Sequence, residues 1–284
     1  MKFVDIEVFN TARTTVDRDE VRRWLDWLGA NEFEIPPEET ISDPALLIAL
    51  AAKRCYLSFQ ASLNPNLTKV RSDLVEYLDN ILKSGHGSVL EHAVYTFNIE
   101  GVSRVFTGEM NRHRAGVGIS EGSMRYIRFN DIPAWCPKSI SLTKGELENI
   151  DHVTGLPADK LAAKKLKTQK VFDRHFKMTE LNYAEIAEIW AEELSPTSKF
   201  HAKKQITSMM RRIVPMGVAT GGTWTFNLRA MRHIIALRAS EAAEEEIAYV
   251  FGKIGKVMHE KEPAIFGDFT QDDAGFWVPK YPKV

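Results

Sequence analysis

The feature that most constrains this fold is helical spacing of apolar residues, which recurs along most of the chain and leaves room for few strands. The predicted helices cover residues 17–27, 44–59, 73–83, 103–113, 171–194, 199–213 and 228–259. Alternating apolar and polar residues predict short strands at 2–9, 93–99 and 124–129. The regular strand–helix alternation of a doubly wound nucleotide fold is missing. The sequence therefore predicts a helix-rich α+β fold with a small antiparallel or mixed sheet, and not a Rossmann fold.

The length of 284 residues fits one large domain with additions. Residues 31–43 are acidic and contain two prolines, which is typical of a loop, so residues 1–43 are expected to form an N-terminal extension. Residues 141–170 are lysine-rich and polar, and we expect a solvated insertion there. A single domain spanning 1–284, with these two additions, is predicted.

Composition excludes several classes of function. The formal net charge of −1 does not indicate a nucleic-acid-binding protein, so an anion site must come from local clustering of arginine and lysine. Neither a secretory signal nor a membrane-spanning apolar stretch is visible in the sequence. Two cysteines, Cys55 and Cys136, cannot build a disulfide framework or a four-cysteine zinc site. We expect a cytoplasmic protein with no membrane partner, no nucleic-acid partner and no metal.

The densest group of chemically active side chains lies at residues 112–126, RHRAGVGISEGSMRY. Three arginines, a histidine, a carboxylate and three hydroxyls occur there, and residues 115–122, which contain three glycines, are expected to form a loop. Guanidinium groups offer a planar fork of donors that suits phosphate, and backbone N–H groups of such a loop can hold the same anion. The alternative is a solvated basic helix end followed by a surface loop.

Two further clusters accompany it. In residues 85–92, GHGSVLEH, Ser88 and Glu91 have the spacing of a capping box, and the two histidines do not match a zinc-ligand spacing. The third cluster contains residues 211–212, Asn227, Arg229, His233 and Arg238. Arg229 and His233 stand one helical turn apart on one face. For Arg238, the alternative is an arginine that borders the apolar stripe with its charge in solvent.

Taken in order, these motifs resemble the flavin-dependent thymidylate synthases (ThyX). The similar segments are 51–130 and 206–247, and they carry Arg-His-Arg, then Glu-x-Ser-x-Arg-Tyr, Asn-x-Arg and a distal arginine. The resemblance implies a homotetramer in which FAD and a pyrimidine nucleotide meet at subunit interfaces. It also implies NADPH as reductant, 5,10-methylenetetrahydrofolate as carbon donor and C5 methylation of dUMP to dTMP without a cysteine nucleophile.

The resemblance also assigns roles by position. It implies FAD-binding roles for Ser88, Glu91, Arg112, His113, Arg114, Asn227, Arg229 and His233. It implies nucleotide-binding roles for Glu109, Arg112, Glu121, Gly122, Ser123, Met124, Arg125, Arg211 and Arg238. The two catalytic candidates are Arg238, which would ionise the pyrimidine at N3, and His86, near the flavin and the folate.

The chain departs from the family pattern at four places. Six residues instead of five separate Arg114 from Glu121, Glu109 replaces a glutamine, His233 replaces an asparagine, and Ala242 replaces a histidine. These positions leave open UMP or another pyrimidine nucleotide as substrate and a hydroxymethyl product. A non-catalytic nucleotide- or nucleic-acid-binding protein that uses the arginines is the alternative of a different class.

Overall fold

The structure is a computed structural model that describes residues 2–67, 69–125, 132–151 and 154–284. It contains two compact units. The first comprises Met1–Glu7, Ile99–Asn111 and Ser120–Gly222, and the second Val8–Asn98, Arg112–Ile119 and Thr223–Val284. Most boundaries between the units fall within strands. The predicted single domain, with additions at 1–43 and 141–170, stays a prediction.

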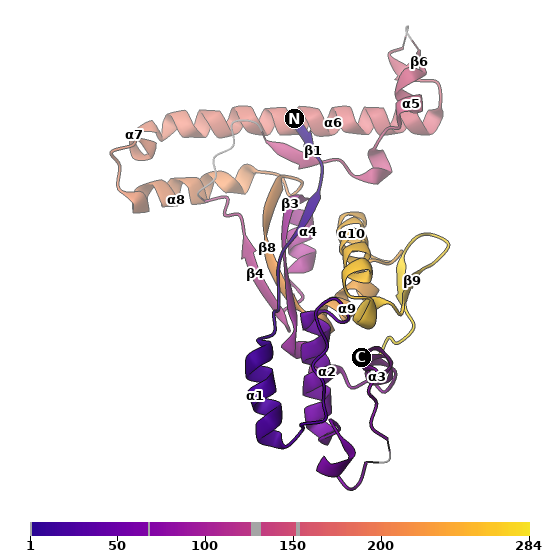
Figure 1. Ribbon diagram of the computed structural model, residues 1–284. Helices are drawn as coiled ribbons and strands as arrows, with labels where there is room; N and C mark the ends of the chain where they lie inside the picture. The colour runs from indigo at the N-terminus through magenta and orange to yellow at the C-terminus, as the bar shows by residue number, and fades with distance from the viewer. Residues whose placement is uncertain (1, 68, 126–131, 152–153) are drawn as a thin grey trace. The chain divides into compact units, whose positions relative to one another are not determined.

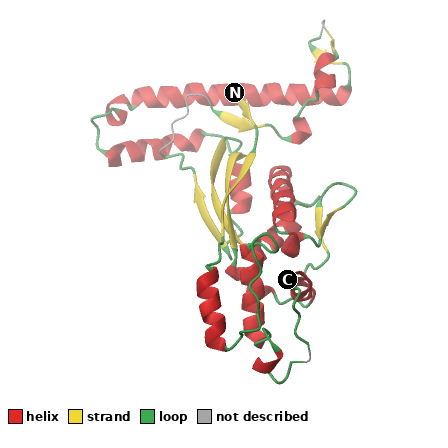
Figure 2. Ribbon diagram, viewed as in Figure 1, coloured by secondary structure: helices red, strands yellow, loops and turns green. Residues whose placement is uncertain are grey.

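The central element is a four-stranded sheet with strand order β2-β3-β8-β4. Its strands are β2 (Glu7–Arg13), β3 (Val94–Ser103), β4 (Val117–Glu121) and β8 (Ala219–Asn227). The remaining strands form three two-stranded sheets, one parallel and two antiparallel. Helices dominate the rest of the structure (Figure 2). The predicted helix-rich α+β class with a small sheet and no Rossmann topology is confirmed.

The second unit packs its helices around Tyr95, Phe97, Trp224 and Phe226, the fully buried aromatic residues of β3 and β8. Its elements are α1 (Arg18–Leu28), α2 (Asp43–Tyr56), η1 (Ala61–Leu63), α3 (Leu74–Lys83), η2 (Gly87–His92), α9 (Leu228–Arg238), α10 (Glu245–Lys261), α11 (Pro263–Phe266), β9 (Phe269–Gln271) and β10 (Trp277–Pro279). Polar side chains begin the predicted helices: Asp17, Ser42 and Asp73 accept N–H groups of the first turns of α1, α2 and α3.

The first unit contains the longest helix, α6 (Lys160–Ile189), and α8 (Phe200–Met210) lies alongside it (Figure 1). Its elements are β1 (Lys2–Val4), α4 (Arg104–Met110), β5 (Pro133–Trp135), η3 (Lys138–Ile140), α5 (Lys144–Glu148), β6 (Ile150–Asp151), β7 (Leu156–Pro157), α6 (Lys160–Ile189), α7 (Ala191–Leu194), α8 (Phe200–Met210) and η4 (Arg211–Ile213). Phe176 of α6 packs with Met124, Ile132 and Val218, whereas Tyr183 packs with Leu194 and Met210.

Several predicted boundaries differ from the structure. The helix predicted at 228–259 is two helices, because Ala239 ends α9 and the Glu244 carboxylate accepts the N–H groups of Glu246 and Ile247 to begin α10. Helix α6 begins at Lys160, so residues 160–170 are helical, and α5, β6 and β7 lie in the rest of 141–170. That this segment is an insertion stays a prediction.

Two local predictions were wrong, and a third stays a prediction. The capping box at Ser88 and Glu91 is wrong, because residues 87–92 form a 3₁₀ helix whose N-cap, His86, makes no side-chain cap. The segment predicted as a glycine loop, 115–122, contains strand β4, which pairs with β8. The strand predicted at 124–129 lies mostly outside the described residues.

Among the described residues, no helix has both the length and the apolar character needed to cross a bilayer.

A buried ion pair fixes α9 to the C-terminal segment. Arg232 donates two hydrogen bonds to the carboxylate of Asp268, at 2.6 and 2.9 Å, and their side chains are 4% and 5% exposed. The Arg232 guanidinium also donates to the carbonyls of Ile265 and Tyr281 and lies 4.8 Å from the ring centroid of Phe269. Because both charges are desolvated, each depends on the other.

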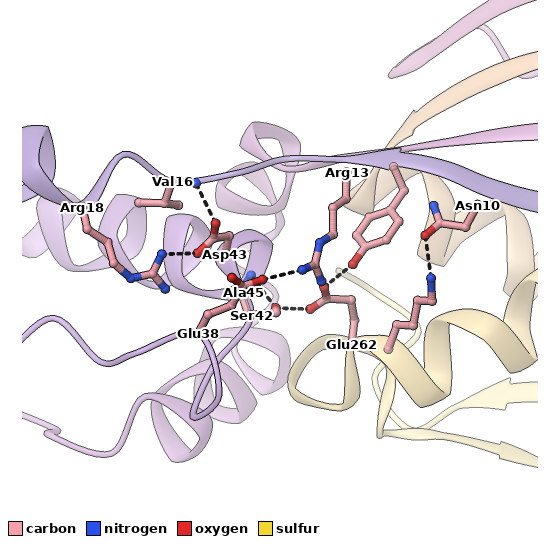
Figure 3. Close-up of polar contacts among 11 residues, drawn as sticks. Asn10, Arg13, Val16, Arg18, Glu38, Ser42, Asp43, Ala45 and Glu262 are labelled. Atoms are coloured by element: carbon pink, nitrogen blue, oxygen red, sulfur yellow. Dashed lines mark hydrogen bonds and ion pairs between the residues drawn. The ribbon is translucent and has the colours of Figure 1, made fainter.

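A second buried network surrounds Glu262, which is 1% exposed (Figure 3). Its carboxylate accepts the hydroxyl hydrogens of Ser42, at the start of α2, and Tyr95 of β3. Burial raises the pKa of Glu262 above 4.5, although the two hydrogen bonds and the charge of Arg13 act in the opposite direction. Arg13 forms an ion pair with Glu38 in the same region.

We predict that Asp268→Asn lowers the free energy of unfolding by about 3–5 kcal/mol, because it leaves Arg232 charged and buried without its partner. Urea unfolding followed by circular dichroism measures this. The double variant Arg232→Met, Asp268→Leu should recover part of the loss, since it removes both charges. A double variant less stable than the single variant would contradict this account.

We further predict that the stabilising contribution of Glu262 falls as the pH rises. A carboxyl group with a raised folded-state pKa contributes fully below its unfolded-state value of about 4.3 and loses that contribution as the pH passes its folded-state pKa. The difference in unfolding free energy between the native protein and Glu262→Gln should therefore decrease from pH 4 upward. A difference that grows over this range would contradict the raised pKa.

Candidate functional site

A cavity of about 600 Å³ lies in the second unit, and we call it the α9 cavity. Four separate segments form it: η2, the residues between α4 and β4, the N-terminal part of α9, and Val284. Its walls contain Glu91, Arg112, His113, Arg114, Ala115, Gly116, Asn227, Arg229, Ala230, His233, Ile234 and Val284. The structure thus brings residues that are more than a hundred positions apart in the sequence to one cavity.

The α9 cavity carries three guanidinium groups and one carboxylate, so its local charge is positive although the chain carries a formal net charge of −1. Arg229 forms an ion pair of 2.6 Å with Glu91, and these side chains are 45% and 48% exposed. An exposed pair of this kind is weak and exchanges partners readily. The cavity therefore has the electrostatic character of an anion site.

Gly116 permits a close approach of backbone to side chain in the cavity wall. Its φ is 71°, and a Cβ atom there would lie 2.5 Å from the Asn227 side-chain amide. The Gly116 carbonyl accepts the Asn227 N–H at 2.9 Å, while the Asn227 side chain accepts the Ala230 N–H at 2.8 Å and begins α9. The segment 112–116 and the start of α9 are thus fixed to each other through Asn227.

Arg238 contacts the Arg-His-Arg segment directly. Its Nε–H donates to Nε2 of His113 at 2.9 Å. Because Nε2 accepts, the neutral His113 ring carries its proton on Nδ1. The ring of His233 lies 6.4 Å from that of His113, centroid to centroid. Arg238 is outside the cavity wall but touches a side chain that forms it.

Two predicted residues of the same unit lie elsewhere. Ser88 is exposed, and His86 is half-buried with its ring 5.7 Å from that of Tyr56. Neither residue is in the wall of the α9 cavity. The Nδ1 atom of His86 is buried and has no hydrogen-bond partner within the described part of the chain.

The first unit has its own arginine-rich pocket, of about 410 Å³, which we call the η4 pocket. Its walls contain Arg104, Glu121, Gly122, Ser123, Met124, Arg125, Arg211 and Arg212. Six of these were predicted as nucleotide-binding residues from the resemblance. Glu109, also predicted there, is half-buried on α4 and outside the pocket wall.

The loop that forms the η4 pocket is held by Arg104, which the sequence analysis missed. Its guanidinium forms an ion pair with Glu121, donates to the carbonyl of Gly122 at 2.6 Å and contacts the sulfur of Met124 at 3.2 Å. Asn111 donates to the other carboxylate oxygen of Glu121. The remaining arginines, Arg125, Arg211 and Arg212, supply the positive charge of the pocket.

The residues that the structure describes contain no group of three or more histidine, cysteine, aspartate or glutamate side chains that could hold a metal ion. Neither Cys55 nor Cys136 lies in the wall of either candidate site. The polar side chains of the α9 cavity are guanidinium, imidazole, amide and carboxylate groups, and those of the η4 pocket are guanidinium, carboxylate and hydroxyl groups.

A family match and two sequence relatives agree on the family of this chain. Residues 38–264 match the family described as "Thymidylate synthase complementing protein". The chain is 32% identical over 246 residues to the flavin-dependent thymidylate synthase of Mycobacterium sp. (strain JLS), a match covering 85% of this chain and 88% of that protein. It is 30% identical over 232 residues to the enzyme of the same name from Corynebacterium aurimucosum, covering 82% of each.

Solved structures are similar in fold. The UMP/dUMP methylase PolB from Streptomyces cacaoi, bound with 5-Br UMP, aligns with a TM-score of 0.61 at 14% identity, over 94% of both chains. Thymidylate Synthase X from Helicobacter pylori, with FAD and dUMP, aligns with a TM-score of 0.50 at 19% identity, over 93% of this chain and 98% of that one. The family match and the identities of 32% and 30% carry the assignment: the chain belongs to the flavin-dependent thymidylate synthase family of methyltransferase enzymes.

Proposed function

We propose that the protein methylates C5 of dUMP to give dTMP, with FAD as cofactor, NADPH as reductant and 5,10-methylenetetrahydrofolate as carbon donor. The observation that carries this proposal is the α9 cavity. Seven of the eight residues predicted to bind FAD, all except Ser88, form its walls although they come from three distant segments. The assigned roles of these residues are part of the proposal.

The residues of the α9 cavity fit a flavin dinucleotide. Arg112, Arg114 and Arg229 are suited to a pyrophosphate, because each guanidinium can donate two parallel hydrogen bonds to phosphate oxygens. Gly116 keeps the wall beside Asn227 free of a Cβ atom and lets a ligand approach the backbone. When bound and reduced, the flavin supplies the hydride, while the protein supplies position and charge.

The η4 pocket fits the nucleotide. Arg125, Arg211 and Arg212 provide the charge that a 5′-phosphate requires, and Glu121 and Ser123 provide groups that can hydrogen-bond to a ribose or a base. Arg104, in the same wall, holds this loop through its ion pair with Glu121 and its hydrogen bond to the Gly122 carbonyl, contacts that need no ligand. Such preorganisation lowers the entropy cost of binding.

Arg238 acts on the pyrimidine in this proposal. Hydride addition to the ring builds negative charge along the N3–C4–O4 edge, and a guanidinium stabilises that charge because it remains protonated. His113 orients Arg238 through the contact to Nε. No cysteine nucleophile is needed, and neither Cys55 nor Cys136 lies in the wall of the α9 cavity or of the η4 pocket, which agrees with that. His86 remains the proposed residue near the flavin and the folate.

The same resemblance extends the proposal to a cytoplasmic homotetramer that has no nucleic-acid or membrane partner. UMP as the substrate and a hydroxymethyl group as the transferred carbon remain open alternatives, because the four departures from the family pattern concern the predicted ligand-binding region. The PolB protein of similar fold is itself described as acting on both UMP and dUMP. Substrate choice is therefore part of the first experiment.

We predict that Arg238→Ala lowers kcat by about 10²–10³-fold, equivalent to about 3–4 kcal/mol of barrier, because a preorganised donor is lost. The assay is anaerobic, contains FAD, NADPH and methylenetetrahydrofolate, and offers dUMP and UMP in parallel with products identified by mass. Arg23→Ala, on an exposed face of α1, is the control. Unchanged turnover in the Arg238 variant would remove that residue from the mechanism.

We predict that Gly116→Ala reduces the flavin absorbance of the purified protein, because the added methyl group meets Asn227 and the backbone has a φ that favours glycine. Gly118→Ala is a matched control two residues away, where the nearest atom lies at an ordinary 3.6 Å. Loss of flavin from the Gly116 variant, with flavin retained by the Gly118 variant, supports the assignment. Equal flavin content in both variants would place the cofactor elsewhere.

A further inference from the structure

The buried ion pair of Arg232 and Asp268 also holds the chain that follows β10. The N–H of Tyr281 donates to the Asp268 carboxylate at 3.2 Å, and the Tyr281 carbonyl accepts a hydrogen bond from Arg232 at 3.2 Å. The Tyr281 hydroxyl donates to Asp79 of α3 at 3.1 Å. Because both backbone polar groups of Tyr281 bond to a buried pair, residues 282–284 continue from an anchored position.

The next three residues, which we call the 282–284 segment, lie against the turn at the start of η2. A Cβ atom at Gly85, whose φ is 70°, would lie 3.0 Å from the carbonyl oxygen of Lys283. A Cβ atom at Gly87 would lie 2.5 Å from the backbone carbon of Val284. Two glycines thus let the segment pack directly against the backbone of this turn.

Gly87 is the point at which the 282–284 segment meets Arg229. A Cβ atom there would also lie 2.9 Å from Nε of Arg229. The φ of Gly87 is not positive, so other residues could adopt its backbone conformation, and the close approach of Val284 and Arg229 is what excludes a side chain. Val284 and Arg229 therefore lie side by side over Gly87, and both belong to the wall of the α9 cavity.

The 282–284 segment forms part of the cavity wall without filling the cavity. A volume of about 600 Å³ remains with Val284 in place. The Arg229 side chain is 45% exposed, and a long side chain with that freedom loses rotamer entropy when a ligand immobilises it. A neighbour that restricts the side chain beforehand reduces this cost. The segment can therefore strengthen the binding of an anion through Arg229.

We propose that the 282–284 segment positions Arg229 for the anionic ligand of the α9 cavity. The segment acts through Arg229, and its anchor is the ion pair that also holds α9. The inference rests on the proposed function in one respect, namely that the ligand is the pyrophosphate group of FAD. The restriction of Arg229 itself requires no flavin.

The first test compares the native protein, freed of flavin, with a variant that lacks residues 282–284. Titration with FAD should show an affinity lower by about three- to tenfold, the range expected when one side chain is no longer preorganised. The kcat at saturating FAD and nucleotide should remain native, because no residue of the segment lies in the wall of the η4 pocket. A lowered kcat with native FAD affinity would overturn the proposal.

A double-mutant cycle tests whether the segment acts through Arg229. In an Arg229→Ala background, removal of residues 282–284 should cause no further loss of FAD affinity, because the side chain that the segment restricts is already absent. A further loss as large as the loss in the native background would overturn the proposal.

Gly87→Ala displaces the segment without shortening the chain, because the added methyl group meets the backbone of Val284. We expect a loss of FAD affinity similar to that of the shortened variant. Gly252→Ala is the matched control, since a Cβ atom there meets nothing within 4 Å. Circular dichroism shows that each variant is folded. Native FAD affinity in either the shortened or the Gly87 variant would overturn the proposal.

Two measurements separate this inference from the proposed function, because they need no flavin. Inorganic pyrophosphate, titrated by calorimetry, should bind the shortened variant more weakly than the native protein. Amide hydrogen exchange of residues 87–92 should be faster in the shortened variant, since the segment no longer covers them. If both results are obtained but the native protein binds no FAD, only the proposed function is rejected. Equal binding of pyrophosphate to the two proteins, or none to either, overturns the positioning role.

Discussion

The α9 wall of the α9 cavity depends on the buried ion pair between Arg232 and Asp268. It joins α9 to the segment after α11, and the aromatic ring of Phe269 covers the guanidinium. From the same helix, Arg229 and His233 reach the α9 cavity. A buried pair adds little stability over apolar packing, but losing one partner is costly because the other charge is left buried and unpaired. The pair therefore holds α9, and the side chains that α9 contributes to the cavity wall, against the C-terminal segment.

Local sequence patterns predicted the helices well because helical spacing records which face of each helix is buried. The helices starting at Arg18, Asp43 and Leu74 were predicted within two residues of their N-terminal ends, where polar N-cap side chains also mark the start. Strand β4 was predicted as a loop, since its glycines favour turns and its pairing with β8 is set by a segment about a hundred residues away. The break before Glu244 was missed because the apolar stripe continues across it.

Sequence motifs predicted the residues of the candidate sites. They did not predict the contacts that hold those residues in place. Arg-His-Arg and Asn-x-Arg were recognisable as a set, and most of their side chains line one cavity. Arg104 and Arg232 gave no comparable signal, because their carboxylate partners lie 17 and 36 positions away and only the fold brings them together. An arginine within an apolar helical stripe, as Arg232 is, could have indicated a buried ion pair.

The half-exposed contact between Arg229 and Glu91 has a consequence for ligand selection. An incoming anion must displace this carboxylate before it can use the guanidinium. A weak monovalent anion gains little by that exchange, whereas a pyrophosphate, with several charges on adjacent oxygens, gains more than the displaced carboxylate loses. Glu91 thus acts as an internal competitor for Arg229, and because their pair is exposed and weak, the preference that it gives to highly charged ligands is modest.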